Sequence, residues 1–587
     1  MLGKIIDIKE DLITVKLDIN IYEVGNLIEK NVIFEEQDKR IVGEIITANP
    51  EQLEINIIGQ IINDSYIYGS IVKPSFKTPC RIISKEEMKI LFHNEANNII
   101  EIGSSVVYEN YRIALDVDTF FSNHFAVLGN SGSGKSYSIS KILQSIFYSA
   151  KENIPFKTNM FIFDAYGEYQ PAFNNIGRNN QNLNYKVITT NLKSNEYEHL
   201  CIPFWLLGTD DIALLLNADN VNQLPIIEKA LKLVGYFTKD ESSVIEQKND
   251  IIARCILDII FSGKSPSEIR NKLTSVLTKF KTKDINLDVS ITKGGWTRTF
   301  RQCIYVDESG KFADIEVIIN YLENFTQNEF ELVMPDGSFA YGLKEFSLAL
   351  EFALISEGTL TSNKVFDYSN ALKIRLNSLI NSDYAAMFNY PTFTNKEGFI
   401  KNLLTTQNGR KAQIINFNIN YVDDRMAKNL TKIFSKLLFD YLASLPNRAS
   451  MAFHILLEEA HRYVQHDIDI ELFGYNIFER IAKEGRKYGV LLGLISQRPS
   501  EISETAISQC SNFLVFKMFH PKDLEFINSI LPNINSNLIN RLKTFRSGTC
   551  VTYGTAFKMP TIINIDTPDP GPLSQNVDIT NTWYVKQ

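Results

Sequence analysis

The chain has 587 residues, of which 44% are hydrophobic and 22% are charged, and its formal net charge is −8 at pH 7. This length allows about two to four domains, and the balance of residues is typical of a soluble globular protein. The 6 cysteines lie far apart without any C-x-x-C spacing, which excludes a disulfide framework and a zinc site of the common kind.

The sequence lacks the marks of membrane insertion and of export. It contains no apolar run of roughly 18 residues, so we expect no membrane-spanning helix. The N-terminal stretch carries acidic residues inside its apolar part, unlike a signal peptide. We therefore expect a cytoplasmic protein with reduced thiols. The negative net charge disfavours a protein that coats DNA with its whole surface, and it restricts any DNA contact to a local surface such as the channel of a ring.

Short stretches of alternating apolar and polar residues occupy the first 80 residues. ITVKL (13–17) and LEINI (53–57) both alternate in this way, and RIVGEIITA lies between them. Several short strands at this spacing predict a small β-barrel. A simpler β-rich cap is the alternative.

The stretch GNSGSGKS, residues 129–136, fulfils the phosphate-loop pattern G-x-x-x-x-G-K-[ST]. In such a loop the backbone N–H groups hold the β-phosphate, the lysine reaches the β- and γ-phosphates, and the serine hydroxyl binds Mg²⁺. The preceding HFAVLG reads as a buried strand and the following SISKILQSIFYSA has helical spacing, which is the context that this loop requires. The residues predicted to bind ATP are Gly129, Ser131, Gly132, Ser133, Gly134, Lys135, Ser136 and Tyr137.

A second GKS occurs in FSGKS (261–265), but it lacks the rest of the pattern. Asp258, and not glycine, stands five residues before Gly263. The stretch also follows the helix-like run IIARCILDIIF instead of a strand. We therefore predict the end of a helix followed by a loop, and no nucleotide site.

The remaining elements alternate between an α/β pattern and a helical one. Residues 81–204 hold the phosphate loop and two further strands, of which the first ends at Asp164. Residues 205–388 show apolar residues at three- and four-residue spacing and predict a mostly helical insertion, interrupted by a hairpin near 297–317. The α/β pattern returns over 389–565, and the proline-rich tail 566–587 is expected to lie extended on a surface, such as that of a neighbouring subunit.

Glu458 and Glu459 follow an apolar strand in HILLEEAH. Hydrolysis of a nucleoside triphosphate needs one carboxylate for the Mg²⁺ shell and another that orients or deprotonates the attacking water. Adjacent residues at the end of a strand point in different directions, so this pair can serve both purposes. We assign Glu458 to the metal, together with Ser136, and Glu459 to the water. The alternative is an exposed acidic pair at the start of a helix.

Two further polar residues follow in RIAKEGRKYGVLLGLISQRPSEI. Gln497 ends a buried strand, where it can sense the γ-phosphate or position water, although an ordinary polar residue at the end of a strand would look the same. Arg486 lies in a basic turn and can be directed at the γ-phosphate of a neighbouring subunit. A solvated basic turn is the alternative for Arg486, and Arg480 is the second choice for the same role.

These motifs, in this order, resemble the HerA family within the HerA–FtsK group of RecA-like hexameric ATPases. The resemblance covers most of the chain and rests on the N-terminal barrel and on GNSGSGKS, FDAYGEY, CIPFWLL, LLEEAH, EGRKYG and SQRPSEI. In the family the first acid after the strand is usually aspartate, where this chain has Glu458. The family's Gly-Arg-Lys element matches Gly485, Arg486 and Lys487, which supports Arg486 as the residue that acts in trans.

The resemblance implies an α/β fold with a RecA-like P-loop ATPase core, an N-terminal barrel and a helical insertion. It also implies a homohexamer that encloses double-stranded DNA and moves along it with ATP and Mg²⁺. Members of the family often work with a partner that docks on the barrel face, either a nuclease such as a NurA-like one or a sirtuin-like NAD-consuming effector. The partner's role lies in DNA end processing or in antiphage defence, and the long insertion favours defence.

Two other functions remain open on the sequence. The ring can be a scaffold that assembles and activates an effector enzyme, with ATP controlling assembly and little translocation. Basic residues lining a channel, for which RLKTFRSG (541–548) is one choice, would favour translocation instead. The other function is a DNA-pumping ATPase for conjugation or segregation, which normally needs a membrane anchor.

Overall fold

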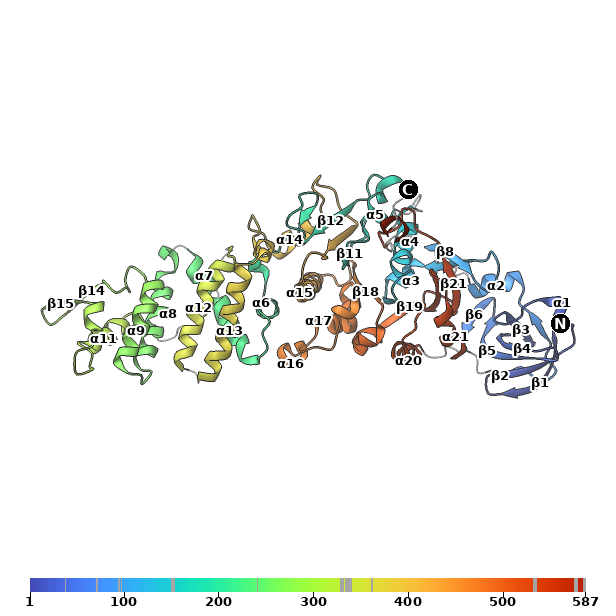
Figure 1. The fold of residues 1–587 in the computed structure, drawn as a ribbon, viewed down its shortest axis with the longest axis horizontal. Coiled ribbons are helices and arrows are strands. Elements are labelled where there is room, and N and C mark those ends of the chain that lie inside the picture. Colours follow the sequence, from blue (N-terminus) through green and yellow to red (C-terminus); the bar gives the residue numbers. More distant parts are fainter. Residues whose placement is uncertain are drawn as a thin grey trace.

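The computed structural model has an elongated shape with three parts in a row (Figure 1). A small barrel stands at one end, an α/β core lies in the middle, and a helical part extends from the other end. The structure describes the chain except for residues 37–38, 70–71, 93–95, 97, 149–153, 240, 328–331, 333–339, 361–362, 532–535, 575–578 and 584–587. Among the described residues, no helix is long and apolar enough to cross a membrane.

The N-terminal part is a closed barrel, as predicted. Its strands pair in the order β2-β1-β7-β3-β4-β5, and β5 pairs again with β2, which closes the ring; β6 is attached to β5. The long strand β5 alternates buried and half-buried residues along its whole length, because one face lines the barrel interior. The bounds are β1 Gly3–Lys9, β2 Leu12–Leu17, β3 Asn31–Glu36, β4 Lys39–Ala48, β5 Gln52–Ile62, β6 Ser65–Tyr68 and β7 Cys80–Ile82, with α1 Ile21–Val24 and α2 Lys85–Phe92.

The core contains a 12-stranded sheet with the order β13-β12-β16-β11-β17-β18-β10-β19-β20-β21-β8-β9. Neighbours from β13 to β19 are parallel, and the pairs from β19 to β9 are antiparallel. The bounds are β8 Ile99–Ser105, β9 Arg112–Asp116, β10 His124–Leu128, β11 Met160–Asp164, β12 Tyr185–Thr189, β13 Glu198–His199, β16 Ile414–Asn418, β17 Phe453–Glu458, β18 Val490–Ser496, β19 Cys510–Phe516, β20 Thr549–Gly554 and β21 Thr561–Ile565.

Helices cover both faces of the parallel strands, so these strands are apolar throughout. In β10, Phe125 and Val127 pack in the cluster that contains α4, whereas Ala126 and Leu128 pack in the cluster that contains α15. Burial on both faces is why HFAVL reads as a continuous apolar run. The core helices are α3 Val117–Phe121, α4 Lys135–Tyr148, α5 Gln170–Phe173, α14 Lys396–Leu403, α15 Asp424–Ala443, α16 Asp469–Phe473, α17 Ile477–Arg480, α18 Arg486–Tyr488, α19 Glu504–Ile507, α20 Pro521–Ile530 and α21 Ser536–Arg541.

The extension at the far end is the expected helical part. The helices are α6 Thr209–Leu215, α7 Leu224–Thr238, α8 Glu241–Ile260, α9 Pro266–Lys279, α10 Phe300–Cys303, α11 Ile315–Glu323, α12 Leu343–Leu360 and α13 Asn363–Ile380. A hairpin of β14 Ser290–Lys293 and β15 Trp296–Thr299 begins before the expected stretch, and within that stretch Val306 and Phe312 form an isolated antiparallel bridge. Gly294 and Gly295 adopt the positive φ of the hairpin turn. The chain cannot continue as a strand beyond β15, because Thr299 caps α10.

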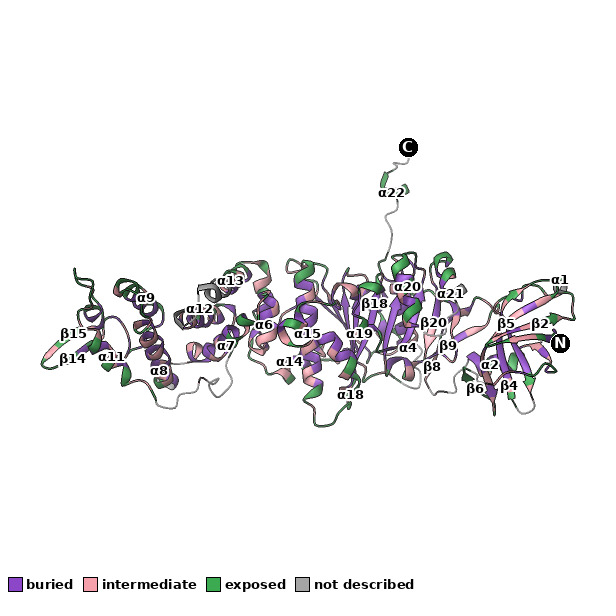
Figure 2. Cartoon of the chain, turned by 90° about the horizontal axis from the view of Figure 1, so that it is seen from below, coloured by how far each residue is buried: buried purple, intermediate pink, exposed green. Residues whose placement is uncertain are grey.

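Two predictions about loops can be compared with these elements. FSGKS lies between the end of α8 and the start of α9, and Ser265 caps α9, so the stretch is a helix–helix connection as expected. The C-terminal tail crosses the core, where Gln144 of α4 donates to the Pro570 carbonyl at 2.7 Å. The last described element of the tail is a short helix, α22 Ile579–Trp583, which lies away from the rest of the protein in Figure 2. Trp583 is exposed, and Tyr584 lies outside the described residues.

Candidate nucleotide-hydrolysis site

The phosphate loop connects β10 to α4 at the carboxyl end of the parallel strands. Gly129, Gly132 and Gly134 have φ values of 156°, 69° and 110°, which other residues rarely adopt. A Cβ atom on Gly129 would lie 2.5 Å from the Cβ atom of Phe516, and one on Gly134 would lie 2.9 Å from the backbone nitrogen of Gly548. The glycines are therefore required both by the backbone conformation and by the neighbouring chain.

Three neighbouring segments hold the loop in place. The Gly129 N–H donates at 3.1 Å to the carbonyl of Ser496, the last residue of β18. The Asn130 N–H donates to the Lys517 carbonyl at 2.9 Å. The Gly548 N–H donates to the Ser133 carbonyl at 2.9 Å. The stretch 541–548, proposed from the sequence as a channel surface, therefore braces the phosphate loop at its far end. Its side chains Lys543 and Arg546 remain exposed.

The loop presents donors that fit a polyphosphate. The Lys135 ammonium is buried and donates to the Gly129 and Asn130 carbonyls at 2.7 and 3.0 Å, so it folds over the space that the loop encloses. The Ser133 hydroxyl is buried without a hydrogen-bond partner. Ser131 and Gly132 are exposed at the tip of the loop. The first turn of α4 adds unpaired backbone N–H groups and the positive end of the helix dipole.

Tyr137 lies in that first turn of α4, where its side chain faces the C-terminal tail. A Cβ atom on Gly571 would lie 3.3 Å from the Tyr137 ring. The side chain is thus covered by the tail, and what Tyr137 can offer to a phosphate is its backbone N–H.

The two adjacent glutamates lie next to the loop. The Ser136 hydroxyl donates to Glu458 Oε1 at 3.3 Å, and Glu458 Oε2 is buried without a partner. Burial and the nearby carboxylate of Asp164 raise the pKa of Glu458 well above its usual range. Glu459 has a left-handed backbone with φ 52° and ψ 46°, which turns its side chain away from the direction that β17 would give it. Burial also raises the pKa of Glu459, although Lys135 opposes the shift.

This donor set fits a hard divalent cation such as Mg²⁺. It offers a serine hydroxyl and an unpaired, buried carboxylate oxygen beside a loop that can hold phosphates. Among the described residues there is no group of three or more His, Cys, Asp and Glu side chains that could hold a metal ion by themselves. Such a site therefore relies on phosphate oxygens and water for the remaining ligands.

Two acidic residues that we gave no role from the sequence also belong to the site. Asp164 ends β11 and accepts hydrogen bonds from the backbone N–H groups of Gly167, Glu168 and Tyr169 at 2.8 to 3.1 Å. This turn places the Glu168 carboxylate near the Ser136 hydroxyl; burial raises the pKa of Glu168, and the hydroxyl opposes the shift. The run FDAYGEY, an acid at the end of an apolar strand followed by a second acid, is the signal that could have identified them.

Gln497 follows β18 directly, in the gap between the acidic strand β17 and the loop strand β10. Its backbone N–H is among the groups that lower the pKa of Glu459. His461, which the sequence reasoning did not single out, lies close by, with its Nδ1 atom 3.1 Å from the Ser496 hydroxyl. Burial lowers the pKa of His461, so this side chain is neutral at pH 7.

Arg486 lies at the opposite edge of the sheet. Its guanidinium donates to Asn123 Oδ1 at 2.9 Å, immediately before β10 begins, whereas the phosphate loop follows the end of β10. The strand separates the two by roughly 13 Å, since each residue of a strand rises about 3.3 Å. Arg480 is half-exposed and is held against its own subunit: it stacks on the rings of Phe439 and Tyr475 at 5.0 and 5.6 Å and lies 3.7 Å from Glu484. Of the two arginines, Arg486 is the exposed one.

Comparison with known proteins finds similarity to HerA helicases. The model for "Helicase HerA, central domain" matches residues 100–300. The probable DNA double-strand break repair helicase HerA of Methanocaldococcus jannaschii is 21% identical over 95% of this chain and 98% of its own length. The DNA double-strand break repair helicase HerA of Pyrococcus furiosus is 21% identical, with 89% of this chain and 79% of that protein covered. The structure of VirB4 of Thermoanaerobacter pseudethanolicus is 13% identical with a TM-score of 0.41, covering 81% of this chain and 98% of that chain. The chain is therefore similar to the central domain of HerA helicases over residues 100–300, and to archaeal HerA helicases over most of its length.

Proposed function

We propose that the chain is an ATP-driven motor that moves double-stranded DNA and works as a homohexamer. The observation that carries the proposal is the division of the site between two edges of one sheet. The phosphate loop, Glu458, Glu459 and Gln497 meet at the carboxyl edge, and Arg486 is exposed at the other edge. A ring in which the second edge of one copy faces the first edge of the next would complete the site.

Within one subunit, Lys135 and the loop N–H groups would bind the β- and γ-phosphates of ATP. Ser136 and Glu458 would hold Mg²⁺, which supplies charge neutralisation between the phosphates when bound. Glu458 stands where the family usually has aspartate, and its contact with Ser136 is the observation that supports it in this role. Its extra methylene still allows a carboxylate oxygen to reach the metal shell directly or through water.

Glu459 would orient the attacking water and take its proton. Its left-handed backbone directs the carboxylate toward Lys135, which opposes the rise of its pKa. Gln497 would contact the γ-phosphate or the same water, since it ends the strand between the acidic strand and the loop. Arg486 of the next subunit would stabilise the charge that develops on the transferred phosphoryl group.

DNA as the substrate follows from the relatives, which are named for DNA double-strand break repair. The net charge of −8 restricts contact to a local surface, and the exposed Lys543 and Arg546 lie on the element that also braces the phosphate loop. A shift of this element on DNA binding would move the phosphate loop, and with it the bound nucleotide. Reversal of these two charges tests this proposal, because DNA binding should then fall while ATP binding remains.

The docking of an effector on the barrel face is part of the same proposal. The effector would be a nuclease, NurA-like or another, or a sirtuin-like enzyme, and the setting would be DNA end processing or antiphage defence. The barrel exposes large apolar side chains, among them Ile6, Tyr22 and Phe76, which supports a protein partner on this part. Co-expression with the products of neighbouring genes, using the chain with and without these side chains changed to serine, tests the docking.

The experiment that tests the motor is ATP hydrolysis by the purified oligomer with and without long duplex DNA. We expect stimulation by DNA that is lost in Glu459→Gln and kept in Glu471→Gln, a matched change of an exposed carboxylate away from the site. Hydrolysis that ignores DNA would contradict the motor and favour a scaffold for an effector enzyme. A chain that stays monomeric with ATP and Mg²⁺ would contradict both.

A further inference from the structure

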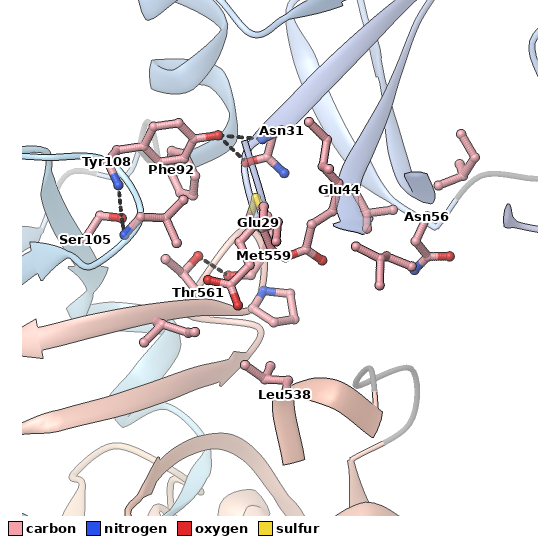
Figure 3. Close-up of a pocket in the computed structure, with 18 of the residues that line it drawn as sticks. Glu29, Asn31, Glu44, Asn56, Phe92, Ser105, Tyr108, Leu538, Met559 and Thr561 are labelled. Atoms are coloured by element: carbon pink, nitrogen blue, oxygen red, sulfur yellow. Dashed lines mark hydrogen bonds between the residues drawn. The ribbon is translucent and has the colours of Figure 1, made fainter. Parts of the chain in front are cut away.

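The proposed hydrolysis site leaves one oxygen of its catalytic carboxylate unpaired. Glu459 is only 8% exposed, and its Oε2 atom is buried without a hydrogen bond from the described residues. A buried polar group usually finds a partner within the chain. The Tyr108 hydroxyl does so in the wall of the cavity between the barrel and the core, where it donates to Asn31 Oδ1 at 2.9 Å (Figure 3). An unpaired buried oxygen is costly, and a donor that reaches Glu459 Oε2 would also fix the orientation of the carboxylate.

The imidazole of His461 lies beside this oxygen. Its Nδ1 atom is 3.3 Å from Glu459 Oε2 and 3.1 Å from the Ser496 hydroxyl, and its side chain is 12% exposed. The short turn after Glu459 fixes this place, since the Arg462 N–H donates to the Glu459 carbonyl at 2.8 Å. His461 is thus within reach of the carboxylate that the proposed mechanism uses as its base.

The two oxygens around Nδ1 decide which ring nitrogen of His461 carries the proton. Burial lowers the pKa of His461, so the ring is neutral at pH 7 and carries one N–H group. For Glu459 to take a proton from water it must be ionised, and an ionised carboxylate only accepts hydrogen bonds. An Nδ1 atom without a proton would bring a lone pair close to this negative oxygen, whereas an Nδ1–H group is attracted to it. The tautomer with the proton on Nδ1 is therefore favoured when Glu459 is ready to act.

Ser496 anchors the imidazole. This residue ends β18 and is fully buried. Its hydroxyl oxygen also accepts from the Arg498 N–H at 3.0 Å, and its carbonyl accepts from the Gly129 N–H at 3.1 Å. The end of the strand that holds the phosphate loop therefore also holds the ring of His461.

We propose that His461 is a positioning residue for hydrolysis. Its Nδ1–H donates to Glu459 Oε2 and holds the carboxylate toward the attacking water, while the Ser496 hydroxyl keeps the ring in place. The imidazole needs only a small rotation for this, since the distances from Nδ1 to the two oxygens are nearly equal. His461 keeps its own proton, and the proton of the water goes to Glu459. The inference rests on the proposed role of Glu459 as the base.

The test compares three variants of His461 in the full-length assembled protein. Asparagine carries its amide nitrogen as many bonds from Cα as Nδ1, whereas glutamine carries it at the position of Nε2. Loss of one hydrogen bond to a charged group should lower kcat for ATP about 10- to 100-fold in His461→Ala and His461→Gln. His461→Asn should return kcat to within about threefold of the unmodified protein, because it restores the donor. The KM for ATP and the binding of a fluorescent ATP analogue should stay unchanged in all three.

A matched control and two outcomes decide this comparison. His466→Ala changes an exposed histidine in the segment that follows and should leave kcat unchanged. Thermal unfolding of each variant checks the fold. Equal rates in His461→Asn and His461→Gln, or a kcat that His461→Ala leaves unchanged, would overturn the proposal.

A double-mutant cycle separates action through Glu459 from a role in the fold. Single-turnover hydrolysis of radiolabelled ATP measures the residual rate of Glu459→Gln. His461→Ala added to this variant should lower the rate by less than about twofold, because the residue that His461 positions is already disabled. A further loss as large as that in the unmodified protein would show that His461 acts without Glu459 and would overturn the proposal.

The same measurements keep this inference apart from the proposed function. If Glu459→Gln hydrolyses ATP at the unmodified rate, Glu459 is not the base and both proposals fail. If Glu459→Gln is inactive and His461→Ala keeps its full kcat, the proposed motor stands and only the role of His461 is refuted.

Discussion

The two edges of the parallel sheet differ in the kind of titratable group that they bury. At the carboxyl edge, Glu458 and Glu459 each leave a buried carboxylate oxygen without a hydrogen bond, and the pKa of both is raised. At the amino edge, His124 and His454 each bind the backbone through one ring nitrogen and leave the other without a hydrogen bond, and burial lowers their pKa values. The first edge thus buries carboxyl groups that a bound cation would help to ionise, whereas the buried histidines of the second edge are neutral at pH 7.

Arg486 is a charged group at the amino edge, where the buried histidines are neutral. Arg486 is exposed there and donates a hydrogen bond to Asn123, and β10 separates it from its own phosphate loop. We therefore expect Arg486 to serve hydrolysis in a neighbouring copy, as proposed above. The comparison therefore predicts which variants fail within one subunit and which fail between subunits.

The largest expected effect is that of Arg486→Ala. We expect a loss of about 10³-fold in ATP hydrolysis with ATP binding retained, because the arginine acts on the transition state and not on the bound nucleotide. Arg480→Ala is the matched control and should reduce stability through its lost ring contacts while leaving more activity.

Mixed oligomers separate action in trans from action in cis. Arg486→Ala and Lys135→Ala subunits are each inactive alone, but a mixture should regain part of the activity where an intact loop meets an intact arginine. A mixture that regains nothing would argue that Arg486 acts within its own subunit or only holds the fold.

The second largest effect on ATP hydrolysis is expected from a comparison of the two GKS stretches. Lys135→Ala should lower hydrolysis by about 10²–10³-fold, since it removes a buried cation directed at the phosphates. Lys264→Ala, in the connection between α8 and α9, should leave hydrolysis unchanged. Radiometric or coupled phosphate assays at saturating ATP check both variants. A comparable loss in Lys264→Ala would undermine the distinction that we draw between the two loops.

Much of this architecture could be predicted from the sequence. The apolar runs that precede GNSGSGKS and LLEEAH are buried strands because helices cover both faces of the sheet, and Glu458 indeed lies beside Ser136. Alternation in LEINI likewise predicted a barrel strand. These predictions succeed because hydrophobic period and glycine conformations are local properties of the chain.

The features that escaped prediction depend on distant contacts. Glu168 reaches Ser136 only because Asp164 accepts three backbone hydrogen bonds and folds the intervening turn. The bracing of the loop by Gly548 joins residues more than 400 positions apart, which no local pattern encodes. The hairpin of β14 and β15 was not predicted, and the predicted stretch forms α10, capped by Thr299, followed by an isolated antiparallel bridge between Val306 and Phe312.

The third prediction concerns the amino edge. Burial lowers the pKa of His124 from 6.5 to about 4, so the unfolded chain binds more protons between these values. The neutral His124 contributes its full stability above about pH 6.5. As the pH falls toward 4, the free energy of unfolding decreases by up to about 3 kcal/mol. His124→Asn keeps an acceptor for the Leu492 N–H without titrating and should show a shallower loss. Urea unfolding at several pH values measures it, and an identical slope in both proteins would refute the cause.

The smallest expected effect is a gain in stability at the carboxyl edge. Glu458→Gln should abolish hydrolysis and yet stabilise the nucleotide-free protein by about 1 kcal/mol, because it replaces a carboxyl group whose ionisation is disfavoured by burial and nearby carboxylates with an amide that can donate to Asp164. Glu471→Gln should leave the unfolding midpoint unchanged. Differential scanning fluorimetry of the two variants without nucleotide checks the sign. A loss of stability in Glu458→Gln would mean that the carboxylate holds the fold together, and the contrast between the two edges would then rest on Arg486 alone.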